Sequence, residues 1–246
     1  MSMIHRLTFG LIFALFASVS HGQTFSSTNK QVNLIELYTS EGCSSCPPAD
    51  KWLNKLASAD GLWTRFIPLA FHVDYWDYIG WKDPYAQPRY TQRQYQYHHA
   101  DTLRSVYTPA VLVNGQEWRA WRRHEPPNLE IDNAGLLSLT VESDTLSAHY
   151  ESPLPKNQTL VLNIAILGFD QISQVKNGEN VGQSFKHDFV VLAYRTVAMQ
   201  PEQTRFTINS TTLPKSQIHS TRRAIVTWVN TLASPTPIQA TGGWLN

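Results

Sequence analysis

The sequence predicts an α+β protein in which an α/β domain, over residues 31–125, precedes an all-β, sandwich-like C-terminal module over residues 136–246. In the first part, apolar runs of strand length alternate with runs that have helical periodicity. From Leu136 onward, short apolar or alternating runs are separated by turn residues, which is typical of an antiparallel sandwich. We expect strands there near residues 136–142, 146–151, 159–167, 187–197, 205–209 and 223–229.

Residues 1–22 have the pattern of a cleavable secretory signal peptide. A basic start precedes an apolar run from Leu7 to about Val19, and small residues follow up to Gly22. The run is short for a membrane span, so an uncleaved anchor is the less favoured alternative. We therefore expect cleavage near Gly22 and a periplasmic or secreted protein that has no membrane association afterwards.

The composition excludes some classes of partner. The 20 Lys and Arg residues nearly balance the 19 Asp and Glu residues, and the formal net charge is +1. Because no basic run is present, electrostatics give no reason to expect a nucleic-acid or anionic-membrane partner. The sequence has no phosphate-binding glycine loop, and we expect no cofactor.

Both cysteines of the chain, Cys43 and Cys46, lie in one Cys-x-x-Cys motif. The apolar run at 32–38 predicts a strand before the motif, and apolar residues at helical spacing from Trp52 predict a helix after it. A thiolate at Cys43 would then lie at a helix N-terminus, where the helix dipole and free N–H groups lower its pKa. Cys46, one turn inside the helix, would be the shielded resolving thiol.

A disulfide between Cys43 and Cys46 would close a very short loop. Such a loop removes little chain entropy, so we favour a reactive pair over a structural staple. A zinc site would need two further ligands, and we do not expect one. Paired thiolates also suit Cu(I), so copper handling, in which His72 could assist, stays an alternative.

The second predicted strand spans the long apolar run from Phe66 to Val73. With a helix between them, the two strands should be parallel, and their carboxyl ends should share one edge of the sheet. The loop that follows would therefore lie beside the cysteines. Its Tyr75, Trp76 and Trp81 are candidate substrate-binding residues that offer flat apolar surface, and the alternative is that they fill the core.

The remaining part of the first domain predicts a helix and a hairpin. Residues 89–100 place tyrosines on one helical face, and Asn114–Gly115 predicts a hairpin turn between strands at 111–113 and 117–121. Pro109 stands just before the first of these strands, so it marks an edge, a strand start or a cis bond. The arginines that follow, Arg119, Arg122 and Arg123, form a small basic cluster, which a solvated surface explains better than a site for acidic ligands.

The order of the predicted elements over about residues 31–125 resembles the thioredoxin fold. A strand leads to Cys-x-x-Cys on a helix, and a second strand and a second helix follow. The segment ends with Thr-Pro before an apolar strand and an Asn-Gly hairpin. The resemblance implies that Pro109 is cis and lies against the cysteine pair. It also implies that the backbone at Thr108 pairs with an extended substrate. A buried acid on the first strand would accept the cysteine proton, and Glu36 is the candidate.

The segments IELYTSEGCSSCPPAD, FHVDYWDYIGWKDP, VYTPAVLVNG and NGENVGQSFKHDFVV resemble the exported thioredoxin-like family catalogued as domain of unknown function twelve-twenty-three. This resemblance covers nearly the whole chain after the signal peptide, and it implies a fold without an established reaction. Within the last segment, Glu179, Asn180, His187 and Asp188 could line a contact surface. A network of turns is the favoured interpretation of these residue types.

Three functions are compatible with these features. The favoured one is a thiol–disulfide oxidoreductase or isomerase, in which Cys43 attacks and Cys46 resolves a mixed disulfide with exported protein thiols or a redox partner protein. The second is a non-enzymatic binding or assembly protein, in which the disulfide is structural and the β module recognises the partner. The third is the Cu(I)-handling protein.

Overall fold

The structure is a computed structural model of the 246-residue chain, and it describes residues 22–123, 131–153, 157–202 and 205–246. Except for Gly22, the predicted signal peptide lies outside the described residues. Within those residues, no helix is both long and apolar enough to cross a membrane.

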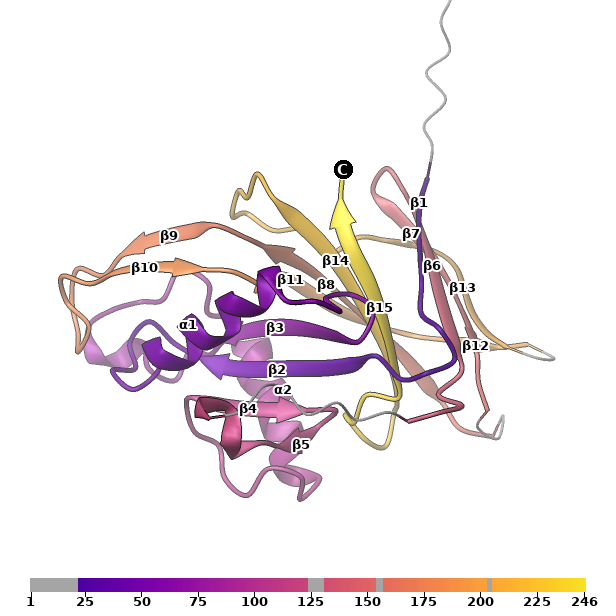
Figure 1. The fold of residues 1–246 in the computed structure, drawn as a ribbon, viewed down its shortest axis with the longest axis horizontal. Coiled ribbons are helices and arrows are strands. Elements are labelled where there is room, and N and C mark those ends of the chain that lie inside the picture. The colour runs from indigo at the N-terminus through magenta and orange to yellow at the C-terminus, as the bar shows by residue number, and fades with distance from the viewer. Residues whose placement is uncertain (1–21, 124–130, 154–156, 203–204) are drawn as a thin grey trace, which may run out of the picture.

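Strands make up most of the regular structure, and Figure 1 shows how they are arranged. The strands are β1 (Gln23–Ser26), β2 (Asn33–Thr39), β3 (Phe66–His72), β4 (Ala110–Val113), β5 (Gln116–Glu117), β6 (Leu136–Glu142), β7 (Thr145–Glu151), β8 (Leu160–Gly168), β9 (Gln171–Gln174), β10 (Ser184–His187), β11 (Val190–Ala198), β12 (Gln200–Pro201), β13 (Phe206–Thr212), β14 (Arg223–Thr231) and β15 (Gln239–Leu245). The helices are α1 (Pro47–Lys55) and α2 (Pro88–His99), with short 3₁₀ helices η1 (Leu56–Ser58), η2 (Asp77–Ile79) and η3 (Arg119–Arg122).

An eight-stranded sheet runs through the molecule in the order β15-β14-β8-β11-β3-β2-β4-β5. β2 pairs with β3 in parallel across α1, as predicted, and with β4 in antiparallel. The free side of β3 then pairs with β11, where Val190 lies opposite Ala70. Strands from both halves of the chain therefore share one sheet.

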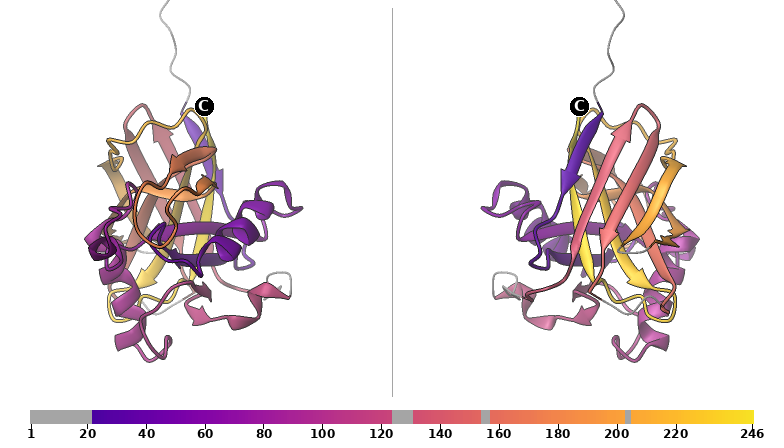
Figure 2. Two further views of the ribbon diagram at one scale, coloured as in Figure 1. Left: turned by 90° about the vertical axis from the view of Figure 1, so that its left-hand side faces the viewer. Right: turned by 90° about the vertical axis from the view of Figure 1, so that its right-hand side faces the viewer.

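A five-stranded sheet, in the order β1-β6-β7-β13-β12, packs against the β8 and β14 part of the larger sheet. Figure 2 (right) shows it as the layer nearest the viewer. Side chains of β8 alternate between two cores: Leu162 and Ile164 face the five-stranded sheet, whereas Ala165 and Leu167 join the core that contains residues of α1 and α2. This alternation is the period of two expected of a strand buried on both faces.

The predicted fold class is wrong. The chain is mostly β-sheet, with 42% strand and 15% helix and only two short α-helices among the described residues, so it is not an α/β thioredoxin-like domain followed by an all-β module. The physical reason is the sheet edge at β3: its unpaired backbone N–H and C=O groups pair with β11, more than a hundred residues later. Pairing over such a distance leaves no local pattern in the sequence.

The predicted hairpin at Asn114–Gly115 is present, and both residues have the positive φ that a two-residue turn requires. Its second strand is shorter than predicted. β5 ends at Glu117, and the chain continues as the 3₁₀ helix η3, which carries Trp121 into the core.

Candidate functional site

The two cysteines lie in a tight turn between the end of β2 and the start of α1. The Cys43 N–H donates to the Ser40 carbonyl (3.1 Å), and the Cys46 N–H donates to the Cys43 carbonyl (3.2 Å). Cys46 is the N-cap residue, and its carbonyl accepts the first helical hydrogen bond from Ala49 at 2.8 Å. The sequence prediction of a cysteine pair at a strand-to-helix turn is confirmed. The prediction that Cys46 lies one turn inside the helix is wrong, because α1 begins only at Pro47 and Cys46 is its N-cap.

Cys43 and Cys46 are joined by a disulfide, with their Cα atoms 5.4 Å apart. Both residues are fully buried, whereas Ser44 and Ser45 between them are exposed. The Ser45 hydroxyl lies 3.4 Å from the Cys43 sulfur. An attacking thiolate must therefore displace part of the surrounding structure before it reaches either sulfur.

The helix start offers fewer donors to a Cys43 thiolate than the sequence suggested. Pro47 and Pro48 occupy the first two positions of α1 and have no N–H. The N–H of Ser44 is already used by the Glu179 carboxylate, at 3.2 Å. A donor that does lie beside the Cys43 sulfur is the Ser45 hydroxyl, and the dipole of α1 adds to its effect.

The hairpin formed by β9 and β10 lies over the disulfide turn. At its tip, the Asn180 side-chain amide donates to the Glu41 carbonyl (2.8 Å) and to the Cys43 carbonyl (3.0 Å). On the α1 side, the Asn54 amide donates to the Lys186 carbonyl at 2.7 Å. In Figure 1 the hairpin extends past the sheet on the side where α1 begins. We refer to residues 171–187 as the covering hairpin.

Glu41, two residues before Cys43, is the buried anchor of the covering hairpin. Its carboxylate accepts hydrogen bonds from the Ser173 hydroxyl and from the Trp81 indole N–H (2.9 Å), and it lies 3.0 Å from His187 Nε2. Ser173 and His187 come from β9 and β10, so both strands of the hairpin contact this one carboxylate. The negatively charged carboxylate of Glu41 therefore interacts with these three partners.

A second buried acid and histidine support the same turn. Asp83 accepts a hydrogen bond from the Glu41 N–H (2.8 Å) and lies 2.7 Å from His72 Nδ1. Burial alone would lower the pKa of His72, but the charge and hydrogen bond of Asp83 outweigh it and raise the pKa to about 9. The same pairing lowers the pKa of Asp83 despite its burial. The rings of His72 and His187 are 5.0 Å apart.

Asp50 lies four residues after Cys46 on α1, and four residues bring side chains to the same helical face. It is buried, and burial raises its pKa because the charged carboxylate loses its hydration, although His187 and His72 partly offset this. The sequence analysis missed Asp50. The signal that could have found it is an acid at helical spacing from the second cysteine.

The Thr108–Pro109 peptide bond is cis, as the family resemblance implied, and Pro109 is buried directly before β4. The Thr108 hydroxyl accepts a hydrogen bond from the Trp76 indole N–H at 2.7 Å. A Cβ placed on Gly42 would lie only 3.1 Å from Trp76 Cβ. Trp76 therefore connects the turn before Cys43 to Thr108.

The three aromatic candidates in the loop after β3 are half-buried, and each donates a hydrogen bond. Trp76 and Trp81 do so to Thr108 and Glu41, and the Tyr75 hydroxyl donates to Gln94 at 3.2 Å. The Trp81 bond holds the loop against the turn before Cys43, whereas the other two attach it to Thr108 and to α2. The aromatic side chain that this loop exposes is Tyr78, at 82%.

Glu36 forms a buried ion pair with Arg93 of α2, which donates two hydrogen bonds of 2.8 Å to its carboxylate. Tyr38 and Tyr97 donate to the same group. Removing one partner of a buried pair typically costs about 3–5 kcal/mol, so this cluster fixes α2 on β2. In the described part of the chain, Glu36 has no hydrogen bond to either cysteine.

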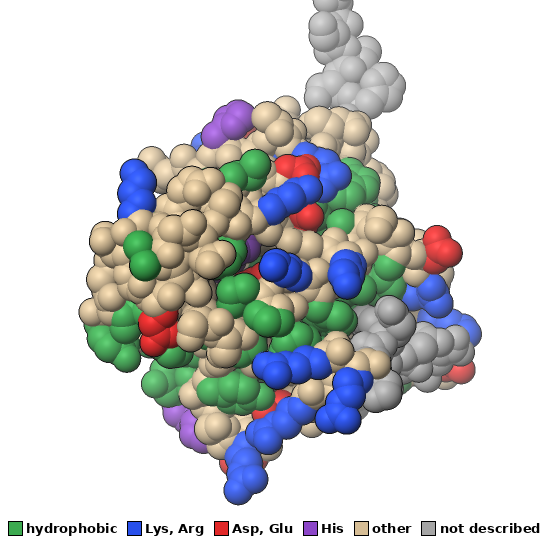
Figure 3. All heavy atoms as spheres, turned by 60° about the vertical axis from the view of Figure 1, so that its left-hand side comes forward, with side chains coloured by type: hydrophobic (Ala, Val, Ile, Leu, Met, Phe, Trp, Pro, Cys, Tyr) green, Lys and Arg blue, Asp and Glu red, His purple; other side chains and the backbone are tan. Residues whose placement is uncertain are grey.

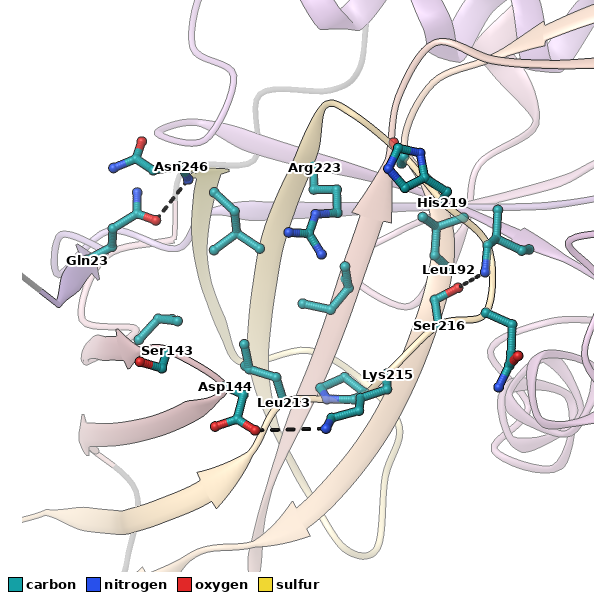
Figure 4. Close-up of a pocket in the computed structure, with 17 residues that line it drawn as sticks. Gln23, Ser143, Asp144, Leu192, Leu213, Lys215, Ser216, His219, Arg223 and Asn246 are labelled. Carbon is teal, nitrogen blue, oxygen red and sulfur yellow. Dashed lines mark hydrogen bonds and ion pairs between the residues drawn. The ribbon is translucent and has the colours of Figure 1, made fainter. Parts of the chain in front are cut away.

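A separate cavity of about 730 Å³ lies near one end of the two packed sheets (Figure 4). Its walls include Leu192 and Arg223, and an ion pair of 3.8 Å joins Asp144 to Lys215 at its rim. None of the predicted site residues lines it. Across the described ranges, no group of three or more His, Cys, Asp or Glu residues is placed to hold a metal ion.

We expect Asn180→Ala to speed the reduction of the Cys43–Cys46 disulfide by dithiothreitol. Loss of the two amide hydrogen bonds should favour an open hairpin by about 1–2 kcal/mol, which corresponds to roughly a tenfold faster reaction. The reaction is stopped with acid at intervals, and alkylation followed by intact mass spectrometry gives the fraction of reduced protein. Gln174→Ala, on the exposed side of β9, is the matched control and should react like wild type; an unchanged rate for Asn180→Ala would show that the hairpin does not limit access.

The raised pKa of His72 predicts a pH-dependent stability. The unfolded side chain titrates near 6.5 and the folded one at about 9. Protonated His72 therefore stabilises the fold fully below pH 6.5, and this contribution is lost as the pH rises toward 9, up to about 3 kcal/mol.

Urea unfolding of the oxidised protein at several pH values between these limits should show this fall, and His72→Gln should flatten it. His219→Gln, at an exposed histidine, should keep the wild-type slope. An equal slope in wild type and His72→Gln would contradict the pairing with Asp83.

Two solved structures are similar to this chain. It is similar to the crystal structure of protein AGR_C_4864 from Agrobacterium tumefaciens, with 25% identity, a TM-score of 0.59 and coverage of 87% of this chain and 94% of that one. It shares a fold with HBP35 of Porphyromonas gingivalis, with 14% identity, a TM-score of 0.60 and coverage of 89% and 76%.

No curated protein matches the chain. The sequence model of the family described as "Protein of unknown function (DUF1223)" matches residues 34–230, a range that contains the cysteine turn and the covering hairpin. The chain therefore belongs to the DUF1223 family of proteins of unknown function.

Proposed function

We propose that this protein carries out thiol–disulfide exchange through Cys43 and Cys46. The observation that supports this most is a group of buried, mutually interacting ionisable side chains that includes Glu41, two residues before Cys43, and Asp50, four residues after Cys46; the others are His72, Asp83 and His187. Buried charges cost stability, and groups of this kind concentrate at functional sites. A structural staple would gain little from a loop this short and would not require them.

The exchange reaction balances with a substrate dithiol as reductant. A substrate thiolate attacks Cys43 Sγ, the Cys43–Cys46 bond breaks, and Cys46 leaves as a thiolate. The second substrate thiolate then attacks the substrate sulfur of the mixed disulfide, forms the substrate disulfide and releases the Cys43 thiolate. The substrate loses two electrons and the protein disulfide gains them; the reverse sequence reduces a substrate disulfide.

Two neighbouring groups suit these steps. The Ser45 hydroxyl, 3.4 Å from the Cys43 sulfur, can donate a hydrogen bond to the Cys43 thiolate. Asp50, one helical turn beyond Cys46 with a raised pKa, holds its proton to a higher pH than an exposed aspartate and can protonate the leaving Cys46. In this proposal Asp50 takes the role that the sequence analysis gave to Glu36, whose carboxylate is occupied by Arg93.

The substrates in this proposal are exported proteins or a redox partner protein. We place the reaction in the periplasm or outside the cell, where disulfides persist, in keeping with the signal-like pattern of residues 1–22. The Thr108 and Pro109 backbone would hold an extended substrate segment. Trp76, tied to Thr108, keeps that backbone beside the cysteine turn.

Substitution of single cysteines tests the proposed order of attack. Cys46→Ser should accumulate a mixed disulfide with glutathione at Cys43, because no resolving thiol remains. Cys43→Ser should accumulate at least about tenfold less, because in this proposal Cys43 is the sulfur that exchanges with the external thiol and Cys46, the N-cap of α1, reacts only with Cys43. Intact mass spectrometry after incubation with oxidised glutathione measures both. Equal adducts on the two variants, or none on either, would refute the proposal.

Complete burial of both sulfurs favours a second candidate, a binding or assembly protein with a structural disulfide. In that case the covering hairpin would be a permanent part of the fold. Thiols would then react with the disulfide only on global unfolding, so its rate of reduction would track the free energy of unfolding across variants.

A further inference from the structure

We propose that a groove beside Pro109 binds an acidic peptide segment of the partner protein. The groove has a volume of about 500 Å³ and is lined by Ser105, Tyr107, Pro109, Arg119, Trp121 and Arg122. This inference rests on the proposed function for its place in the reaction. It adds the chemical class of the substrate segment, which neither the fold nor the disulfide specifies.

The groove adjoins the disulfide turn through two aromatic connections. Pro109 follows Thr108, which Trp76 connects to the turn before Cys43. On the other side, the ring of Trp52 from α1 packs against Trp121, with ring centroids 6.1 Å apart. A peptide that lies in the groove would therefore lie between the Thr108 segment and the Trp52 face of α1.

The charge of the groove is positive. Arg119 is 63% exposed and pairs with Glu117, whose carboxylate also accepts the Tyr107 hydroxyl at 2.6 Å. Arg104 lies near enough to Glu117 to lower the pKa of that carboxyl further, although burial opposes the shift. Glu117 therefore interacts with two arginines, Arg119 and Arg104.

The other arginines next to the groove lack a partner of this kind. Arg122 and Arg123 are exposed, and neither forms an ion pair within the described part of the chain. Figure 3 shows several Lys and Arg side chains on the lower part of one face, the level at which β4 and β5 lie in Figure 1, and others higher on that face. Among the described residues, the groove therefore combines an apolar wall with the unpaired charge of Arg122.

Two of the guanidinium groups lie against the aromatic walls. Arg122 lies over the Trp121 ring at 5.0 Å, and Arg119 lies over the Tyr107 ring at 5.9 Å. Stacking limits the conformations of a guanidinium and leaves its edge available for two hydrogen bonds to a carboxylate. Arg119 already uses this edge to bind Glu117, so Arg122 is the stacked arginine whose edge a peptide carboxylate can take. The sequence favoured a solvated basic surface here, but a solvated surface does not require arginines stacked along one groove.

A peptide suits the groove better than a nucleic acid does. The net charge of the chain is only +1, so electrostatics give little reason to expect a partner as highly charged as a nucleic acid. The groove is also small, and Trp76 connects the Thr108–Pro109 segment at its side to the turn before Cys43. An extended protein segment with Asp or Glu side chains fits both features.

The first experiment measures binding without any sulfur chemistry. A fluorescent, cysteine-free peptide rich in Asp and Glu is titrated with the oxidised full-length protein at low salt, beside a peptide in which Lys replaces each acid. Anisotropy should show at least about tenfold tighter binding of the acidic peptide, weakened by salt. Arg119→Gln with Arg122→Gln should remove most of the preference, whereas Arg205→Gln with Lys215→Gln, the same charge change on exposed residues of the other sheet region, should retain it.

A second measurement separates this inference from the proposed function. The same two peptides, each with two added cysteines, are assayed as dithiol substrates, with oxidised glutathione present to re-form the Cys43–Cys46 disulfide after each turnover. The groove variant should raise KM for the acidic peptide without lowering kcat. If the acidic peptide binds but does not exchange, the groove is still a binding site for acidic peptides and the proposed exchange function is refuted. Three results would contradict the assignment of the groove to acidic peptides. They are exchange at equal rates with both peptides, equal binding of both peptides, and tighter binding of a single-stranded oligonucleotide than of the acidic peptide.

Discussion

The contact between the covering hairpin and Glu41 is the interaction on which the proposed site depends. The Glu41 carboxylate accepts a hydrogen bond from Ser173 of β9 and lies within hydrogen-bond distance of His187 of β10. The Asn180 side-chain amide donates to the backbone carbonyls of Glu41 and Cys43. A buried carboxylate is tolerated only when such partners satisfy it. The hairpin thereby stabilises the turn that carries the disulfide and at the same time covers it.

Single elements were predicted well from local patterns, and their arrangement was not. The strands β6, β7, β8, β11, β13 and β14 match predicted apolar or alternating runs. β15 was missed because its sequence, QATGGWL, contains two adjacent glycines. A Cβ on Gly242 would lie 2.2 Å from the Ile225 carbonyl oxygen, and one on Gly243 would meet the ring of Phe25. Glycine is required there by close approach of distant segments, which no local pattern reveals.

The candidate site shows the same division between local and distant information. The disulfide, the helix start and the Thr108–Pro109 segment follow from motifs of a few residues. Glu36 looked available to the cysteines because its partner Arg93 lies 57 positions later in the sequence. The polar residues of the covering hairpin matched common turn formers, so their contact with the cysteine turn could be seen only after β9 and β10 were placed in space.

The redox equilibrium of the wild-type protein with glutathione is the most direct test of the central claim. The fraction of the Cys43–Cys46 disulfide is measured by alkylation and mass spectrometry across a series of reduced-to-oxidised glutathione ratios. Working oxidoreductases have potentials between about −120 and −270 mV, and the account predicts a value in that range. A potential below about −300 mV is that of a structural disulfide, and it would contradict a role in exchange.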